Sequence, residues 1–185
     1  MLPANQIPNV LTIIRIILIV PFALFVWEHK YIEALVVFFF AGLSDGVDGF
    51  LARQFNWKSR FGAIADPLAD KLLLITAYIM LALTGQIPVW LVCLILGRDL
   101  IIVFGALSYH YFISHYEIKP SIFGKACTMS QIIYVLVVIV KLAEIPMPES
   151  VVSNGLWVVA GVTVFSGLHY MGVWTLRGWH VLKAK

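Results

Sequence analysis

Four aspartates lie within two apolar stretches of the sequence, where a carboxylate needs a chemical reason to be present. Asp45 and Asp48 are three residues apart and Asp66 and Asp70 are four apart, so each pair shares one face of a helix. A carboxylate placed in membrane hydrocarbon costs roughly 2.5–3.5 kcal/mol. Oxygen-only ligands select hard cations such as Mg²⁺, Mn²⁺ or Ca²⁺. Four carboxylates could hold two such ions, an arrangement that clamps a phosphoryl group during transfer.

The elements that must position these aspartates are helices that cross a membrane. The chain has 185 residues, of which 61% are hydrophobic and 12% charged, and its mean hydropathy is +0.93. A soluble domain carries about 25% charged residues. We therefore expect an all-α integral membrane protein that forms a single domain over residues 1–185. Apolar stretches near the length of a membrane span predict six helices, over Leu11–Trp27, Ile32–Arg53, Phe61–Leu83, Pro88–Ile113, Ile122–Leu142 and Val151–Trp174.

The short connection Gln54–Arg60 makes the second and third helices antiparallel, which brings all four carboxylates to the same side of the membrane. Basic residues gather on that side, at Arg53, Lys58, Arg60, Lys119, Lys125, Arg177, Lys183 and Lys185. Because such residues favour the cytoplasm, we expect both termini and the carboxylates there. The N-terminal residues lack the features of a cleaved signal or a mitochondrial presequence, which favours the inner (cytoplasmic) membrane of a bacterium.

Glycines beside the aspartates permit two interpretations. Gly46, Gly49 and Gly62 would leave room for a substrate, or they would let helices pack closely in lipid. Next to four acids they favour a substrate. The acids also permit an interpretation in which the protein is not an enzyme. They would then belong to a protein that binds or transports divalent cations.

The motif Asp45-x-x-Asp48-Gly49-x-x-Ala52-Arg53, followed after eight residues by Gly62-x-x-x-Asp66-x-x-x-Asp70, resembles that of the CDP-alcohol phosphotransferase family without departure. The resemblance extends over nearly the whole chain. It implies the six-helix transmembrane fold of that family, usually a homodimer, and two divalent cations, Mg²⁺ or Mn²⁺. It also implies transfer of a phosphoalcohol group from a CDP-linked donor with release of CMP.

Roles for the motif residues follow from the same resemblance. Asp45, Asp48 and Asp66 would ligate metal and, through it, the diphosphate of the donor. Asp70 would help to hold the second ion and act as general base on the acceptor hydroxyl, provided that the hydroxyl lies within hydrogen-bond reach. Space for the cytidine would come from Gly49, Ala52 and Gly62. Arg53 would neutralise phosphate charge or pair with a motif acid.

Two further segments indicate the donor. Pro8-Asn9-Val10-Leu11-Thr12-x-x-Arg15 resembles family members that use CDP-diacylglycerol. Thr12 and Arg15 would then face the diphosphate, or else they anchor the first helix at the membrane interface. Asp66-Pro67-Leu68-Ala69-Asp70-Lys71 resembles the form shared by phosphatidylglycerophosphate synthases and cardiolipin synthases. We therefore expect CDP-diacylglycerol as donor and a glycerol-type alcohol as acceptor.

The acceptor depends on residues beyond the motif. Arg98 would bind an acceptor phosphate, or it forms a structural ion pair between helices with Asp99. After Asp99 the chain continues IIVFGALSYHY without a second arginine, which resembles cardiolipin synthases. The same enzymes are resembled by Lys119-Pro120-Ser121-x-x-x-Lys125. In contrast, Gly124-Lys125-x-x-Thr128-x-x-Gln131 fits phosphatidylglycerophosphate synthases. The sequence favours phosphatidylglycerol as acceptor and cardiolipin as product, with glycerol 3-phosphate as the alternative. Either acceptor would use Arg98, Lys119 and Lys125.

Overall fold

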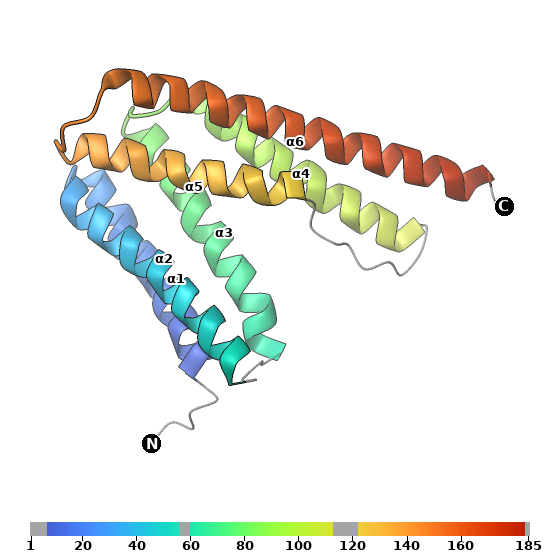
Figure 1. The fold of residues 1–185 in the computed structure, drawn as a ribbon, viewed down its shortest axis with the longest axis horizontal. Coiled ribbons are helices and arrows are strands. Elements are labelled where there is room, and N and C mark those ends of the chain that lie inside the picture. The colour runs from blue at the N-terminus through green and yellow to red at the C-terminus, as the bar shows by residue number, and fades with distance from the viewer. Residues whose placement is uncertain (1–6, 56–59, 113–121, 184–185) are drawn as a thin grey trace. The chain divides into compact units, whose positions relative to one another are not determined.

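The computed structural model describes the backbone of residues 7–55, 60–112 and 122–183, and the side chains of residues 9–44, 46–47, 54–55, 62, 65–105 and 122–173. All secondary structure within these ranges is helical, which confirms the predicted fold class (Figure 1). The helices are α1 (Ile7–Trp27), α2 (Tyr31–Gln54), α3 (Arg60–Leu83), α4 (Val89–Phe112), α5 (Ile122–Leu142) and α6 (Glu149–Lys183). Each begins and ends near a predicted span, except that α6 continues beyond Trp174 to Lys183.

Three helical segments of the described chain are long and apolar enough to cross a membrane, which identifies a membrane protein. They are Asn9–Trp27, Ile122–Leu142 and Glu149–Val173, with mean hydropathies of 2.6, 1.8 and 1.6. In α3, the charges of Asp66, Asp70 and Lys71 fall within the apolar stretch and lower its hydropathy. The predicted total of six spans stays a prediction.

The chain divides into two compact units. The first comprises Met1–Ile87 and Val135–Met147, and the second comprises Pro88–Tyr134 and Pro148–Lys185. Helix α5 therefore contributes its first part to the second unit and its last part to the first. The expected single domain over residues 1–185 stays a prediction.

In the first unit, α1 packs against both α2 and α3 (Figure 1). The rings of Phe22 on α1 and Phe38 on α2 lie 5.5 Å apart between centroids, in the buried core of the hairpin. The end of α3 needs a glycine, because Gly85 has a φ of 74°. There the amide of Gln86 donates to the carbonyl of Leu81 at 2.8 Å, which caps the last turn of α3.

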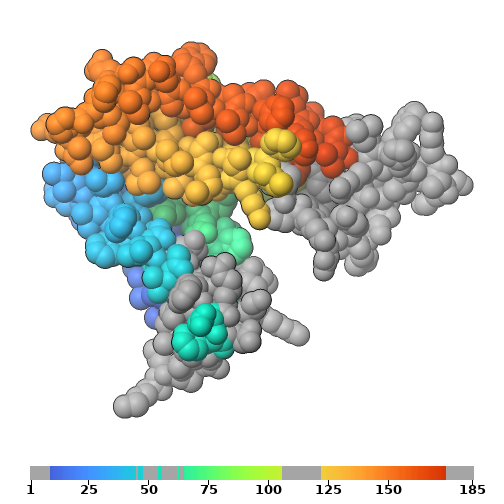
Figure 2. Space-filling view, viewed as in Figure 1, coloured from blue at the N-terminus to red at the C-terminus, as the bar shows by residue number. Residues whose placement is uncertain are grey.

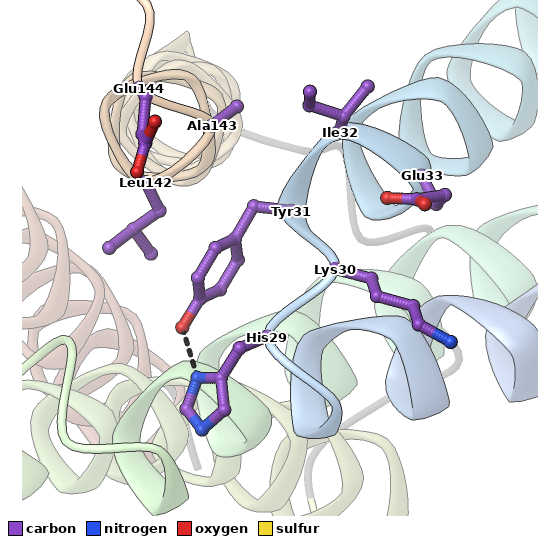
Figure 3. Close-up of a pocket in the computed structure, with 8 residues that line it drawn as sticks. All are labelled: His29, Lys30, Tyr31, Ile32, Glu33, Leu142, Ala143 and Glu144. Carbon is purple, nitrogen blue, oxygen red and sulfur yellow. Dashed lines mark hydrogen bonds between the residues drawn. The ribbon is translucent and has the colours of Figure 1, made fainter.

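The turn between α1 and α2 borders a pocket of about 290 Å³ (Figure 3). Residues 29–33 line it together with residues 142–144, and a 2.7 Å hydrogen bond joins His29 Nδ1 to the Tyr31 hydroxyl. Beside it, Lys30 Nζ lies 2.7 Å from Glu28 Oε2. The hydrogen bond with Glu28 raises the pKa of Lys30. The positive charge of this turn is therefore balanced locally, in contrast to the basic clusters predicted for the opposite side of the membrane.

In the second unit, α4 and the start of α5 pack against α6. Figure 2 shows the yellow side chains at the start of α5 against the orange-red side chains of α6. The ring centroids of Phe123 on α5 and Phe165 on α6 lie 5.2 Å apart. Gly155 on α6 permits a close approach, since a Cβ there would lie 3.0 Å from Cδ2 of Tyr134. Small residues at helix contacts of this kind are typical of helices packed in membranes.

Candidate functional site: two aspartates of α3 held by α1

Two polar side chains of α1 meet the two aspartates of α3. Thr12 and Arg15 are both fully buried. The Thr12 hydroxyl donates a hydrogen bond to Oδ1 of Asp66. Arg15 Nη1 donates to Oδ1 of Asp70 at 2.6 Å and forms an ion pair with it. These two successive contacts follow the same order along both helices, as they must when neighbouring helices run parallel (Figure 1).

Helical spacing and small residues explain why α1 can reach these carboxylates. Thr12 and Arg15 are one turn apart, as are Asp66 and Asp70, so each pair lies along one face of its helix. On α3, Ala65 and Ala69 are 8% and 0% exposed, and their small side chains allow another helix to lie close. The sequence thus builds a narrow contact face in which polar groups pair and methyl groups pack.

The electrostatics of the site depend on one buried cation. Arg15 is completely buried, whereas the side chain of Asp70 is 48% exposed. A buried charge is tolerated in a protein when an opposite charge and hydrogen bonds compensate for its lost hydration. Asp70 gives Arg15 that compensation while keeping its carboxylate accessible. Of the two α3 carboxylates, that of Asp70 is contacted by the Arg15 guanidinium, whereas that of Asp66 accepts from the neutral Thr12 hydroxyl.

The other two motif aspartates belong to α2, which packs against α1. The turn Glu28–Lys30 joins α1 to α2. Counted along the chain from this turn, Asp45 on α2 lies about as far away as Thr12 and Arg15 do on α1. Because a helix rises about 1.5 Å per residue, the backbone of Asp45 is level with that part of α1. The backbone therefore brings the Asp45–Asp48 segment to the height of the contacts with α3.

Several predicted site residues have side chains outside the described part of the structure: Asp45, Asp48, Gly49, Ala52 and Arg53 on α2. Lys119 lies outside the described backbone as well. Gly62 is a buried residue in the first turn of α3. Among the side chains that are described, no three His, Cys, Asp or Glu residues form a metal-binding group. Of the four motif aspartates, these side chains include only Asp66 and Asp70.

Arg98 forms a separate polar cluster in the second unit. Its Nη1 donates to Asp99 Oδ1 at 2.9 Å, and its Nη2 donates to Ser166 Oγ on α6 at 2.7 Å. Its guanidinium carbon lies 5.7 Å from the centre of the Tyr170 ring, and the residue is 8% exposed. The ion pair with Asp99 is therefore formed within α4, and Ser166 provides the bond to the neighbouring helix. Lys125, the other acceptor candidate with a described side chain, is exposed in the first turn of α5.

Sequence reasoning missed Ser166. The signal that could have revealed it is the recurrence of Thr163, Ser166 and Tyr170 at helical spacing in an otherwise apolar helix. All three are buried, and Thr163 contacts Cys127 and Gln131 of α5 at 3.6 and 3.5 Å. This stripe of α6 therefore holds both α4 and α5.

An apolar groove of about 260 Å³ lies beside Arg98 in the same unit. The groove is lined from α4 and α6, by residues that include Cys93, Leu94, Gly97, Ile101, Val164 and Leu168. Arg98 also lines the groove, and a Cβ placed at Gly167 would lie 3.6 Å from its Cγ. The Nη1 atom of Arg98 is bonded to Asp99 and its Nη2 atom to Ser166, so its polar end has partners within the protein. Its alkyl stem is apolar and suits an apolar neighbour.

Comparison with known proteins gives relatives of two activities. A protein of Aquifex aeolicus named CDP-diacylglycerol–glycerol-3-phosphate 3-phosphatidyltransferase is 36% identical, over 67% of this chain and 70% of its own length. The Bacillus subtilis protein of the same name is 29% identical, over 96% of this chain and 97% of its own length.

The other activity appears in Schizosaccharomyces pombe, in a fusion protein named cardiolipin synthase (CMP-forming)/mitochondrial hydrolase. It is 32% identical over 89% of this chain, and the match spans 30% of the fusion protein. Residues 5–175 match the family described as CDP-alcohol phosphatidyltransferase, a range that includes the aspartates, Thr12, Arg15 and Arg98. The chain therefore belongs to the CDP-alcohol phosphatidyltransferase family.

Proposed function

We propose that this protein transfers a phosphatidyl group from CDP-diacylglycerol to a hydroxyl of a glycerol-type acceptor and releases CMP. The observation that carries the proposal is the pair of contacts that fixes two aspartates of the family motif, Asp66 to Thr12 and Asp70 to Arg15. In the reaction the acceptor oxygen forms a new bond to the phosphorus of the phosphatidyl group. The bond from that phosphorus to the CMP oxygen breaks, and the acceptor loses its hydroxyl proton.

The proposed cofactors are two divalent cations, Mg²⁺ or Mn²⁺, held by Asp45, Asp48, Asp66 and Asp70. A donor set made of carboxylates fits these ions, because hard cations prefer oxygen ligands. When bound, the ions would neutralise the diphosphate and stabilise the charge that develops on the departing CMP. The exposed side of Asp70 makes its carboxylate reachable from outside the α1–α3 contact.

Asp70 is the proposed general base. Its 48% exposure lets an acceptor hydroxyl approach, while the bond from Arg15 fixes the direction of the carboxylate. Positioned proton transfer of this kind contributes about 10²–10⁴-fold to a rate. Gly49, Ala52 and Gly62 would leave room for the cytidine, and Arg53 would balance phosphate charge.

Phosphatidylglycerol is the acceptor that we favour, which makes cardiolipin the product. The apolar groove beside Arg98 supports this choice, because a lipid acceptor brings acyl chains that need apolar surface. In this proposal Arg98, Lys119 and Lys125 attract the phosphodiester. Glycerol 3-phosphate remains the second candidate, supported by the relative from Bacillus subtilis that matches over 97% of its length.

We further propose that the enzyme works as a homodimer in a bacterial inner membrane, with the aspartates facing the cytoplasm. The basic clusters near Arg53, Lys125 and the C-terminus support this orientation. The Lys30–Glu28 ion pair supports it as well, because it balances the charge of one connection on the opposite side.

The decisive experiment offers phosphatidylglycerol and glycerol 3-phosphate separately to the purified protein, with labelled CDP-diacylglycerol and Mg²⁺ or Mn²⁺. We expect CMP and cardiolipin with phosphatidylglycerol, and loss of both products when EDTA removes the ions. Phosphatidylglycerophosphate formed from glycerol 3-phosphate alone would replace the favoured acceptor with the second candidate. Failure of every alcohol to release CMP, together with metal flux into proteoliposomes, would instead support a cation transporter.

A further inference from the structure

We infer that Thr12 and Arg15 are positioning residues for the carboxylates of Asp66 and Asp70, and not ligands of the donor diphosphate. The inference rests on the proposed function, in which these aspartates hold divalent ions. It assigns α1 the task of presenting metal ligands that belong to α3. If α1 served only to bind the donor, Thr12 and Arg15 would contact the diphosphate and not the two carboxylates.

Burial separates the two roles. Thr12 and Arg15 are each 0% exposed, so their polar groups lie behind other atoms of the protein. Asp70, in contrast, is 48% exposed, and Asp66 is partly exposed. An incoming ion or diphosphate therefore meets the carboxylates first, with the α1 side chains behind them.

The atoms used in the contacts support the same assignment. Thr12 donates to Oδ1 of Asp66, and Arg15 donates to Oδ1 of Asp70. A hydrogen bond to one oxygen of a carboxylate fixes the rotation of the whole group, and so directs its second oxygen. Residues that orient metal ligands in this way commonly change metal affinity by about 10–100-fold when they are replaced.

The test measures Mn²⁺ binding to the purified full-length protein in detergent, by electron paramagnetic resonance, with no CDP-lipid present. We expect Thr12→Val to bind Mn²⁺ about 10–100-fold more weakly than wild type, because valine keeps the shape and loses the donor. Thr12→Ser restores a hydroxyl and should return the affinity close to that of wild type. Thr163→Val is the matched control, since it removes another fully buried threonine hydroxyl far along the chain, and should leave Mn²⁺ affinity unchanged.

A second variant keeps the test decisive if Thr12→Val does not fold. Arg15→Lys retains the buried charge but replaces the planar guanidinium, and should also weaken Mn²⁺ binding. Wild-type Mn²⁺ affinity in both variants, with weaker binding of CDP-diacylglycerol, would overturn the inference and identify Thr12 and Arg15 as diphosphate ligands. Absence of Mn²⁺ binding by the wild-type protein would remove the metal site itself, which is a failure of the proposed function.

Discussion

At the scale of single residues, the protein depends on charges that are compensated inside apolar helices. Arg15 is fully buried, and its compensation comes from Asp70 at 2.6 Å. Removing one partner of a buried ion pair costs roughly 3–5 kcal/mol, because the other charge is left without compensation. Since Asp70 is 48% exposed, water screens part of this interaction and the cost here is smaller. The same geometry keeps Asp70 accessible for chemistry.

Replacement of Asp70 by asparagine tests its assignment as general base. Asp70→Asn keeps the size of the side chain and an oxygen that can accept from Arg15, so we expect normal membrane insertion. We expect CMP release to fall by at least about 100-fold, because an amide cannot take the acceptor proton. Glu144→Gln, which changes an exposed acid beyond the end of α5, should leave the rate unchanged. Wild-type turnover in Asp70→Asn would remove the assignment.

Residue identity was easier to predict than residue pairing. The motif and the N-terminal segment pointed to Asp66, Asp70, Thr12 and Arg15 as site residues. The contacts between them join positions 54 and 55 residues apart, which only the packing of α1 on α3 determines. Ser166 was missed because a lone serine in an apolar helix resembles an ordinary packing residue until its bond to Arg98 is seen.

At the scale of helices, hydropathy and short connections were sufficient to predict six elements close to their observed ends. The end of α6 was the exception, because the predicted span stopped where the apolar stretch stops, at Trp174. A helix can continue into water after leaving the membrane, since its backbone hydrogen bonds are internal. Hydropathy therefore predicts membrane spans better than it predicts complete helices.

The contact between α5 and α6 gives a test at this scale. Gly155→Ala places a methyl group 3.0 Å from the Tyr134 ring, which must shift. Overpacking of this kind costs about 1–3 kcal/mol, so the thermal unfolding temperature in detergent should fall. Gly161→Ala is the matched control, because a Cβ there meets nothing within 4 Å, and it should not lower that temperature. Equal behaviour of the two variants would contradict the close approach of Tyr134 to α6.

At the scale of the whole molecule, the distribution of charge predicts how the chain lies across the membrane. Lys58→Cys and Lys183→Cys would place thiols on the predicted cytoplasmic side, and Glu28→Cys and Gln86→Cys on the opposite side. The native Cys93 and Cys127 are replaced by serine in this background. A membrane-impermeant maleimide should label the first two positions in inverted vesicles and the other two in right-side-out vesicles. The reverse pattern would invert the proposed orientation and move the aspartates to the other face.

The bond between Arg15 and Asp70 also constrains the biosynthesis of the protein. The two residues are 55 positions apart, so at about 5–20 residues per second Arg15 is made, and leaves the ribosome, several seconds before Asp70 does. During this interval the guanidinium must enter the bilayer or wait beside the insertion machinery without its acid. The mean hydropathy of 2.6 over Asn9–Trp27, the highest of the three apolar spans found among the described residues, offsets the insertion cost of the arginine. Assembly of the aspartate site is thus tied to the moment at which the third helix joins the first.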